Sequence, residues 1–322
     1  APVFDKSLAA SARLGRHAFS KLLEFRMVDV HHPKSVPHFK ADTLAHSVEE
    51  LSTVFNQAGV LVIEGFVEAD DCTRMRDETE RLVSQADLPA DPSVFSTLNH
   101  THASEDYFLG SANDVRFFFE EDAFDEQGNL TVPIGRAINK IGHALHDKNE
   151  RFYRFSRDPR LATICAALGQ RDPKLVQSMY IFKQPHVGGE VVWHQDSTFL
   201  HTAPLSVVGF WFALEDADRT NGCLWALPGA HKLGLKERWK LSSGAMTFES
   251  LREVDWPMEQ AQPLEVPQGT LVVLHGELPH WSAPNRTARS RHAYTLHVVD
   301  GRATYSQDNW LRRPAEDPFC GF

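Results

Sequence analysis

Short apolar runs rich in β-branched and aromatic residues recur from residue 174 onward. They are LVQSMYIF, VVWHQ, SVVGFWFALE, GCLWALPG, TLVVLH and AYTLHVV. Gly, Pro and Asn separate them at intervals suited to an antiparallel sandwich. Their number fits two packed sheets. We therefore predict a mainly β fold with flanking α helices, whose core over about residues 174–300 is a double-stranded β-helix, that is, a cupin-like jelly roll.

The N-terminal half has the period of amphipathic helices instead. An apolar stripe between residues 42 and 59 ends at a glycine, and a second stripe runs from 70 to 85. Residues 137–148 and 159–168 read as two further helices. The strand-like segments VLVIEGF and DVRFFFE lie between them. These elements predict helical support for the β core, within one domain over residues 42–322.

Two segments have open interpretations. Phe117 to Phe119 could line a lipophilic pocket or form a strand buried on both faces, because three adjacent side chains cannot all point one way. Residues 233–262 show no clear periodicity and are interpreted as an insertion over the mouth of the core. Its basic side chains, including Lys236 and Arg238, are candidates for contact with an acidic substrate group.

Residues 1–41 are predicted to be an N-terminal extension. Lys6 to Met27 carries several basic residues among alanine, serine and leucine, with Glu24 alone opposing them. This composition resembles an organellar, for example mitochondrial, presequence, and a short docking helix is the alternative. His31 to Pro37 contains two prolines and is expected to be a linker.

Composition indicates an intracellular, cytoplasmic enzyme. The formal net charge of −10 gives no electrostatic footprint for nucleic acid, so a small-molecule substrate is the expected partner. The sequence contains no run of eighteen apolar residues, so no membrane span is expected. The four cysteines form no CxxC pair and are too few for a disulfide framework, which favours a reducing compartment. Nothing in the sequence indicates an oligomeric state.

Candidate metal ligands occur in QPHVGGEVVWHQDSTFL, where His194 and Asp196 are two residues apart. In a strand, side chains at i and i+2 leave the same face, so both can bind one ion. Gly188 and Gly189 indicate a turn before the apolar residues that precede this pair. The motif alone is weak, because about one HxD is expected by chance. A second histidine would complete the facial triad of non-haem Fe(II) oxygenases.

The third ligand is expected from a later strand, TLVVLH, which follows the turn signal PQG. His275 and His280 are the two candidates. They are five residues apart, a spacing that would place them on opposite faces of an unbroken strand, although Gly276 and Pro279 interrupt it. The spacing does not choose between the two histidines.

Several segments in order resemble the phytanoyl-CoA dioxygenase (PhyH) family, from roughly residue 50 to residue 318. They are INKIGHALH, LVQSMYIFKQPHVGGEV, WHQD, EDADRTNGCLWALPGAHK and HGELPHWSAPNRTARSRHAYTLH. In that family the distal histidine opens an HxS motif, and an arginine lies eleven residues beyond it. His280, Ser282 and Arg291 match this pattern, whereas counting from His275 gives Arg286 and no HxS. The resemblance implies that His194, Asp196 and His280 bind the metal.

The same resemblance implies an activity. Fe(II) and 2-oxoglutarate would be the cofactor and cosubstrate, with O2 as oxidant and ascorbate as a candidate reductant. Arg291 and Ser282 would bind the 5-carboxylate, and Lys140, Met179 and Trp211 would be further cosubstrate contacts. The expected reaction hydroxylates a lipid-like or carboxylic acid substrate and releases succinate and CO2. The alternative is a metal-binding cupin that senses 2-oxoglutarate, or an isomerase that needs no cosubstrate.

Overall fold

The computed structural model describes residues 35–46, 48–86, 93–95 and 106–322. The chain divides into two units, Ala1–His31 and His32–Phe322, and the second holds every element described below. The presequence-like segment from Lys6 to Met27 lies outside the described residues. Within the described ranges, no helix is long and apolar enough to cross a membrane.

The larger of the two main sheets holds nine strands within the described residues. In spatial order they are β1 (His38–Lys40), β2 (Val60–Glu64), β14 (Leu271–His275), β9 (Val208–Ala213), β16 (Ala293–Asp300), β6 (Pro173–Ile181), β5 (Ile138–His143), β4 (Val115–Glu120) and β3 (Val94–Phe95). Strands β9 and β16 are buried at every position, which explains their continuous apolar runs. Strand β1 belongs to the stretch predicted as an extension, yet it pairs with β2.

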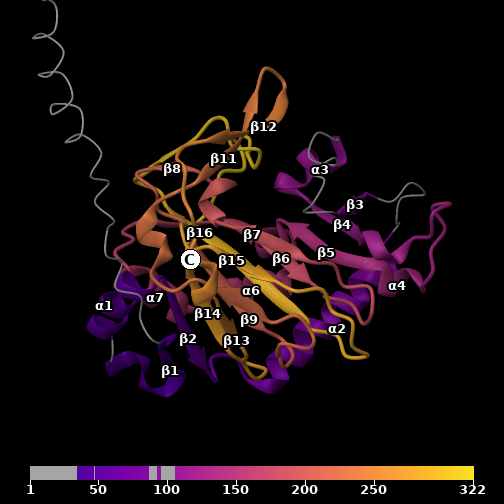
Figure 1. Ribbon diagram of the computed structural model, residues 1–322, viewed down its shortest axis with the longest axis horizontal. Helices are drawn as coiled ribbons and strands as arrows, with labels where there is room; N and C mark the ends of the chain where they lie inside the picture. The colour runs from indigo at the N-terminus through magenta and orange to yellow at the C-terminus, as the bar shows by residue number, and fades with distance from the viewer. Residues whose placement is uncertain (1–34, 47, 87–92, 96–105) are drawn as a thin grey trace, which may run out of the picture. The chain divides into compact units, whose positions relative to one another are not determined.

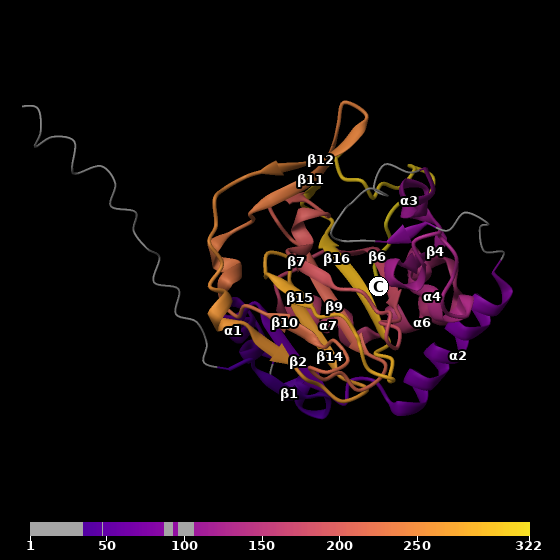
Figure 2. The same ribbon diagram turned by 45° about the vertical axis from the view of Figure 1, so that its right-hand side comes forward.

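A smaller sheet faces this one. Its four strands among the described residues are β13 (Gln262–Leu264), β10 (Leu224–Ala226), β15 (His280–Ser282) and β7 (Val191–His194). Figures 1 and 2 both place β7 and β15 beside β9 and β16. Two packed, mainly antiparallel sheets form the jelly-roll core that the sequence predicts.

The two faces of the larger sheet pack against different parts of the protein. Side chains alternate along a strand, so neighbouring residues of β9 belong to different faces. Trp211 and Ala213 of β9 pack in the core between the two sheets. Phe210 and Phe212 of the same strand pack on the opposite side, against the helices. Those helices are α1 (Val48–Ala58), α2 (Ala69–Gln85), α6 (Glu150–Ser156) and α7 (Pro159–Ala167). The helical support expected from the sequence therefore covers one face, and the interior of the jelly roll lies on the other.

Helices α2 and α7 form close to their expected bounds, whereas α1 ends where expected but begins only at Val48, because Ala41–His46 forms a 3-10 helix. Helix α7 shows why: Pro159 opens it, and the Asp158 carboxylate accepts a hydrogen bond from the backbone N–H of Arg160. Helix α1 is followed by Gly59, whose positive φ of 73° suits a residue without a side chain.

The predicted helix over residues 137–148 is wrong. The segment forms strand β5, with the short helices α4 (Ile134–Ala137) before it and α5 (Leu145–Lys148) after it. Strand β5 pairs with β4 and β6, but its register with β4 shifts beside Asn139. This bulge lets Ile138 and Ile141, three residues apart, pack in the same core cluster. An irregular strand thus imitates the spacing of a helix.

Strand β4 resolves the two interpretations of the adjacent phenylalanines. Phe118 and Phe119 are both fully buried but join different core clusters. They therefore belong to a strand buried on both faces, and Phe118 alone faces the interior side of the sheet.

The insertion at residues 233–262 is partly regular, although residues 251–257 form no helix or strand. It contains the hairpin β11 (Glu237–Ser242) and β12 (Ala245–Ser250), turned by Ser243 and Gly244 at positive φ. Trp239 of β11 is buried against an aromatic cluster, while the tip of the hairpin projects from the fold (Figure 2). Its cationic side chains have local partners: Lys236 lies over the Trp256 ring, and Arg238 donates to the Ser306 hydroxyl.

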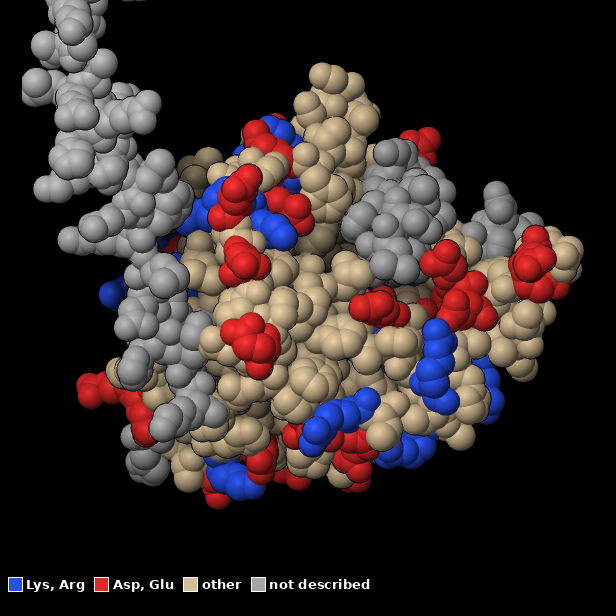
Figure 3. Space-filling view, in the orientation of Figure 1, with Lys and Arg blue, Asp and Glu red and all other residues tan. Residues whose placement is uncertain are grey.

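Two further short elements contribute to the aromatic cluster around Trp239. They are α3 (Asp106–Gly110) and the strand pair β8 (Thr202–Ala203) and β17 (Thr304–Tyr305). Figure 3 shows one face of the molecule, where Lys and Arg are interspersed with Asp and Glu and uncharged surface lies between them. Exposed charges arranged in this way form weak, screened pairs and contribute little to stability.

Candidate metal centre

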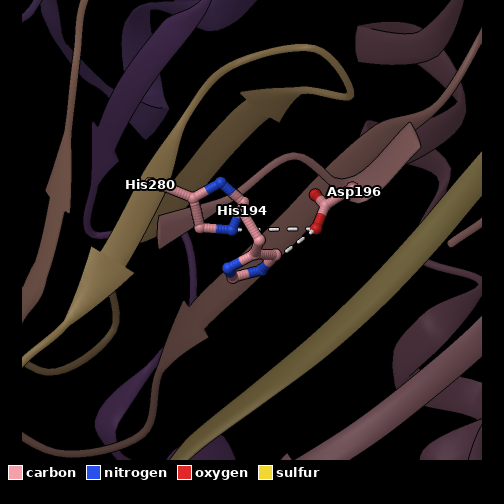
Figure 4. Close-up of side chains that lie close together, drawn as sticks. All are labelled: His194, Asp196 and His280. Atoms are coloured by element: carbon pink, nitrogen blue, oxygen red, sulfur yellow. Dashed lines mark ion pairs between the residues drawn. The ribbon is translucent and has the colours of Figure 1, made fainter. Parts of the chain in front are cut away.

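Three side chains meet where the two short strands β7 and β15 pair. His194 is the last residue of β7, and His280, opposite it in the register, is the first residue of β15. Asp196 follows Gln195, whose extended backbone keeps the expected i and i+2 relation between His194 and Asp196. One ligand atom from each of the three residues lies within 4.8 Å of the others (Figure 4).

Both imidazoles are held in the tautomer that binds a metal. The Nδ1 atom of His194 lies 2.8 Å from the Val192 carbonyl oxygen, and that of His280 lies 3.0 Å from the Leu278 carbonyl oxygen. A carbonyl can only accept, so each Nδ1 carries the proton and each Nε2 presents a lone pair. Second-shell bonds of this kind orient histidine ligands in metal proteins.

Asp196 supplies the negative charge. Its Oδ1 atom is 3.7 Å from the Nε2 atom of each histidine. Burial alone would raise its pKa, but the histidine side chains around it hold the pKa of Asp196 well below the usual range. Burial, followed by the neighbouring His280, lowers the pKa of His194 to about 4. At neutral pH His194 is therefore a neutral imidazole and Asp196 a carboxylate, the protonation states that metal binding requires of them.

The larger sheet supplies a fourth residue that sequence reasoning missed. His297 in β16 places its Nε2 atom 3.4 Å from Oδ2 of Asp196, the oxygen that faces away from the other histidines. Gly209 in β9 leaves room there, since a Cβ at this position would lie 2.8 Å from Oδ2. A histidine inside the apolar run AYTLHVV was the available signal.

The rival residues lie elsewhere. The His275 ring stacks near His231, with 4.8 Å between centroids, and its Nδ1 accepts from the Glu277 backbone. Arg286 is exposed and forms an ion pair with Asp122. Arg291, in contrast, is 1% exposed. The structure thus places His280, and not His275, beside His194, and it buries Arg291 while Arg286 is exposed.

Gln195, between the two β7-side ligands, has a structural role. Its side-chain amide donates to the carbonyl oxygens of Gly234 and Glu277, and its Oε1 accepts from the Lys236 backbone. These bonds tie the base of the β11–β12 hairpin to the loop that carries Asp196.

The expected cosubstrate contacts lie on the interior face of the larger sheet. Met179 in β6 and Trp211 in β9 are both paired with Thr295 of β16, so they form one row across three strands. Lys140 lies on the same face of β5, two residues from Gly142, which pairs with Met179. Lys140 is buried with its Nζ over the Phe118 ring, and burial lowers its pKa to about 7. Lys140 therefore lies buried in a strand, and not in the helix expected over residues 137–148.

Arg291 has unused hydrogen-bonding capacity in a buried place. Its Nε donates to the Gly222 carbonyl oxygen at 3.1 Å, and its guanidinium lies 5.3 Å from the centre of the Trp211 ring. Its Nη1 is buried with no hydrogen-bond partner, and no carboxylate of the described residues forms an ion pair with it. Burial lowers its pKa to about 10, which still leaves it charged at neutral pH. A buried guanidinium in this state fits an anionic ligand.

Aromatic side chains line the other side of the metal ligands. The Phe199 ring lies 6.0 Å from His194 and 5.8 Å from Trp239, measured between centroids. Phe108 and Trp310 continue this cluster, with 4.6 Å between their rings. The C-terminal segment, through Trp310, thus completes an apolar wall near the candidate centre.

Comparison with known proteins agrees with this geometry. The sequence profile of the phytanoyl-CoA dioxygenase (PhyH) family matches residues 55–293. Phytanoyl-CoA dioxygenase of Arabidopsis thaliana is 42% identical over 260 residues, covering 80% of this chain and 91% of that protein. Phytanoyl-CoA dioxygenase domain-containing protein 1 of Mus musculus is 43% identical over 275 residues, covering 82% of this chain and 94% of its own length.

Solved structures share the fold at low sequence identity. EctD from S. alaskensis with 2-oxoglutarate and 5-hydroxyectoine superposes with a TM-score of 0.58 at 18% identity, covering 82% of this chain and 83% of that one. The carbocyclase SnoK from nogalamycin biosynthesis gives 0.59 at 15% identity, with 89% and 100% covered. These structures confirm the jelly-roll prediction, and the family resemblance drawn from the sequence is confirmed as well: the chain belongs to the phytanoyl-CoA dioxygenase family.

Proposed function

We propose that this protein is an Fe(II)- and 2-oxoglutarate-dependent dioxygenase that hydroxylates a small lipid-like molecule or carboxylic acid. The observation that carries the proposal is the meeting of two tautomer-locked imidazoles and one carboxylate, with ligand atoms within 4.8 Å. Family membership and neighbours whose structures hold iron or 2-oxoglutarate support it.

His194, Asp196 and His280 would hold the ferrous ion. The donor set fits that ion, since two imidazoles and a carboxylate on one side leave the other positions open. When bound, the iron supplies the redox chemistry that couples oxidative decarboxylation of 2-oxoglutarate to insertion of one oxygen atom into a C–H bond. The protein residues bind, orient and shield the reactants.

Arg291 would pair with the 5-carboxylate of 2-oxoglutarate through its free Nη1 and the neighbouring Nη2. A planar guanidinium can donate two parallel hydrogen bonds to a carboxylate, which an ammonium cannot. The hydroxyl of Ser282 would add a third donor. Met179 and Trp211 would form the floor of this site, and Lys140 would contribute a positive charge from the next strand.

The substrate would lie against the aromatic cluster beside His194. Phe199, Trp239 and Trp310 offer apolar surface there, which favours a hydrocarbon chain or ring over a fully hydrated ligand. The relatives carry the name phytanoyl-CoA dioxygenase, and acyl-CoA thioesters are therefore one substrate class to test.

Succinate release is the decisive measurement. The protein is supplied with Fe(II), 2-oxoglutarate, O2 and ascorbate, and candidate acyl-CoAs and free hydroxy acids are screened. Each turnover should convert one 2-oxoglutarate to succinate and CO2, while mass spectrometry detects the substrate with one added oxygen. A metal-binding sensor or isomerase yields no succinate with any substrate, and such a result would reject the oxygenase.

A further inference from the structure

A second buried cation lies beside Arg291 and is absent from every expectation drawn from the sequence. Lys183, just after β6, is 2% exposed. Its backbone has a positive φ of 43°, which is uncommon for a residue with a side chain. Backbone strain of this kind is found where a side chain is held for a function, such as clamping a ligand.

The ammonium of Lys183 is aimed at Ser282. Its Nζ lies 2.9 Å from the Ser282 hydroxyl oxygen and 2.5 Å from the Gly189 carbonyl oxygen, with the Ser282 carbonyl oxygen at 3.5 Å. The Nζ atom is the donor in the bond to the Ser282 hydroxyl, and no carboxylate of the described residues is in direct contact with it.

Lys183 and Arg291 lie on neighbouring backbone segments, one just after β6 and the other just before β16. The Arg291 N–H donates to the Lys183 carbonyl oxygen at 3.3 Å, and the Arg291 side chain donates to the Gly222 carbonyl oxygen. Gly222 also gives Lys183 its space, since a Cβ there would lie 2.8 Å from Lys183 Cε. The two cations are thus held at fixed places around one glycine.

The charge around them is incompletely balanced. The buried acid Glu120 accepts hydrogen bonds from the Gly189 N–H and the Asn139 side chain, so it forms no direct hydrogen bond with Lys183, and it attracts Lys183 through charge alone, as Glu190 does. Burial, and then repulsion from Arg291, lowers the pKa of Lys183 well below its ordinary value. A carboxylate placed between Ser282 and Arg291 would relieve both effects.

The hydrogen bond also decides what Ser282 can do. A hydroxyl has one proton and can accept with its lone pairs. Because Lys183 already donates to the Ser282 oxygen, the hydroxyl proton is available to donate to a ligand. Ser282 lies two residues after His280 in β15, so it occupies the same strand face as the metal ligand.

We propose that Lys183 is a positioning residue of the cosubstrate site. By donating to Ser282 it turns the hydroxyl proton toward the distal carboxylate held by Arg291, and so makes the site select a dicarboxylic over a monocarboxylic 2-oxo acid. This inference rests on the proposed function, because it assumes that the ligand is 2-oxoglutarate.

The test compares two ligands on the Mn(II)-loaded full-length chain by titration calorimetry. 2-Oxoglutarate has the distal carboxylate, and 2-oxobutyrate lacks it. Lys183→Met should weaken 2-oxoglutarate by about tenfold or more, the usual effect of losing a hydrogen bond near a charge, and leave 2-oxobutyrate and Mn(II) affinity within about twofold. Lys174→Met, in strand β6, which ends just before Lys183, is half-exposed; it is the matched control and should change neither ligand.

Further variants separate positioning from folding. Lys183→Gln keeps a donor without the charge and should lose less affinity for 2-oxoglutarate than Lys183→Met. Ser282→Ala should weaken 2-oxoglutarate, and adding Lys183→Met to it should cost less than Lys183→Met costs alone, since Lys183 acts partly through Ser282. Equal weakening of both ligands, or unchanged 2-oxoglutarate binding in both Lys183 variants, overturns the inference while the proposed function stands. A wild-type protein that binds no 2-oxoglutarate overturns both.

Discussion

The two ends of the candidate cosubstrate site are built from opposite charges. At the metal end, the neutral His194 and the ionised Asp196 converge with His280. At the carboxylate end, Arg291 and Lys183 are buried around Ser282 with no directly paired acid among the residues described. The metal end therefore carries the negative charge of Asp196, and the carboxylate end carries the positive charge of Arg291.

One short strand joins the two ends. Strand β15 carries His280 at its first position and Ser282 at its last. Two residues of a strand span about 6.6 Å, which is close to the length of a five-carbon dicarboxylate. We therefore propose that the site has a polarity, with the chelating group of the cosubstrate at the β7 end and its free carboxylate at Arg291. The test is whether substitutions at one end lower metal affinity and substitutions at the other end lower 2-oxoglutarate affinity.

The largest expected effect is at the metal end. His194→Ala removes one of three ligands, so we expect metal affinity to fall on the order of 100-fold or more. This loss should exceed the loss of metal affinity caused by changing a residue that only supports a ligand. Succinate formation should then be abolished. Metal affinity is measured by calorimetry with Mn(II), and turnover by succinate release. The control is His275→Asn at the rival histidine, which should keep Mn(II) affinity within about twofold. Retained turnover in His194→Ala would place the metal elsewhere.

The next effect should appear at the opposite end. Arg291→Met removes the guanidinium but leaves the metal ligands in place, so we expect 2-oxoglutarate affinity to fall about 100-fold with Mn(II) affinity unchanged. Arg286→Met, at the exposed rival arginine, should leave both unchanged. A parallel loss of metal affinity in Arg291→Met would contradict the separation of the two ends.

The same comparison shows what the sequence could predict. Two ligands of the metal end could be predicted from the sequence, because the histidine and aspartate of an HxD motif in a strand leave the same face. The choice of His280 over His275 was not accessible from spacing, since it depends on the pairing of β15 with β7, two strands far apart along the chain. Periodicity reports which face a residue occupies and carries no information about which strand lies beside it.

The carboxylate end was only half predicted. Arg291 followed from the family resemblance, but Lys183 in the segment IFKQP reads as the polar end of a strand. Its burial comes from a left-handed backbone and from closure of the smaller sheet over it, and neither leaves a periodic signal. The wrong helix at residues 137–148 has a related cause, because the bulge beside Asn139 shifts the side-chain pattern by one residue. Local irregularities at the site are where sequence patterns fail.

The smallest predicted effect concerns the space around Asp196. Gly209→Ala would place a Cβ 2.8 Å from Asp196 Oδ2, a distance at which either the strand or the carboxylate must move. The carboxylate is the freer of the two, because β9 is paired with β14 and β16 along its length. A displaced Asp196 would bind the metal less well, and we expect Mn(II) affinity to fall about tenfold, in the range of other changes just outside a ligand set. Gly135→Ala, where the nearest atom would be 3.8 Å away, is the matched control.

Because Gly209 is at the metal end, the Gly209→Ala protein should keep its preference for 2-oxo acids that have a distal carboxylate. A change in that preference, measured with 2-oxoglutarate and 2-oxobutyrate, would show that the two ends are coupled through β9.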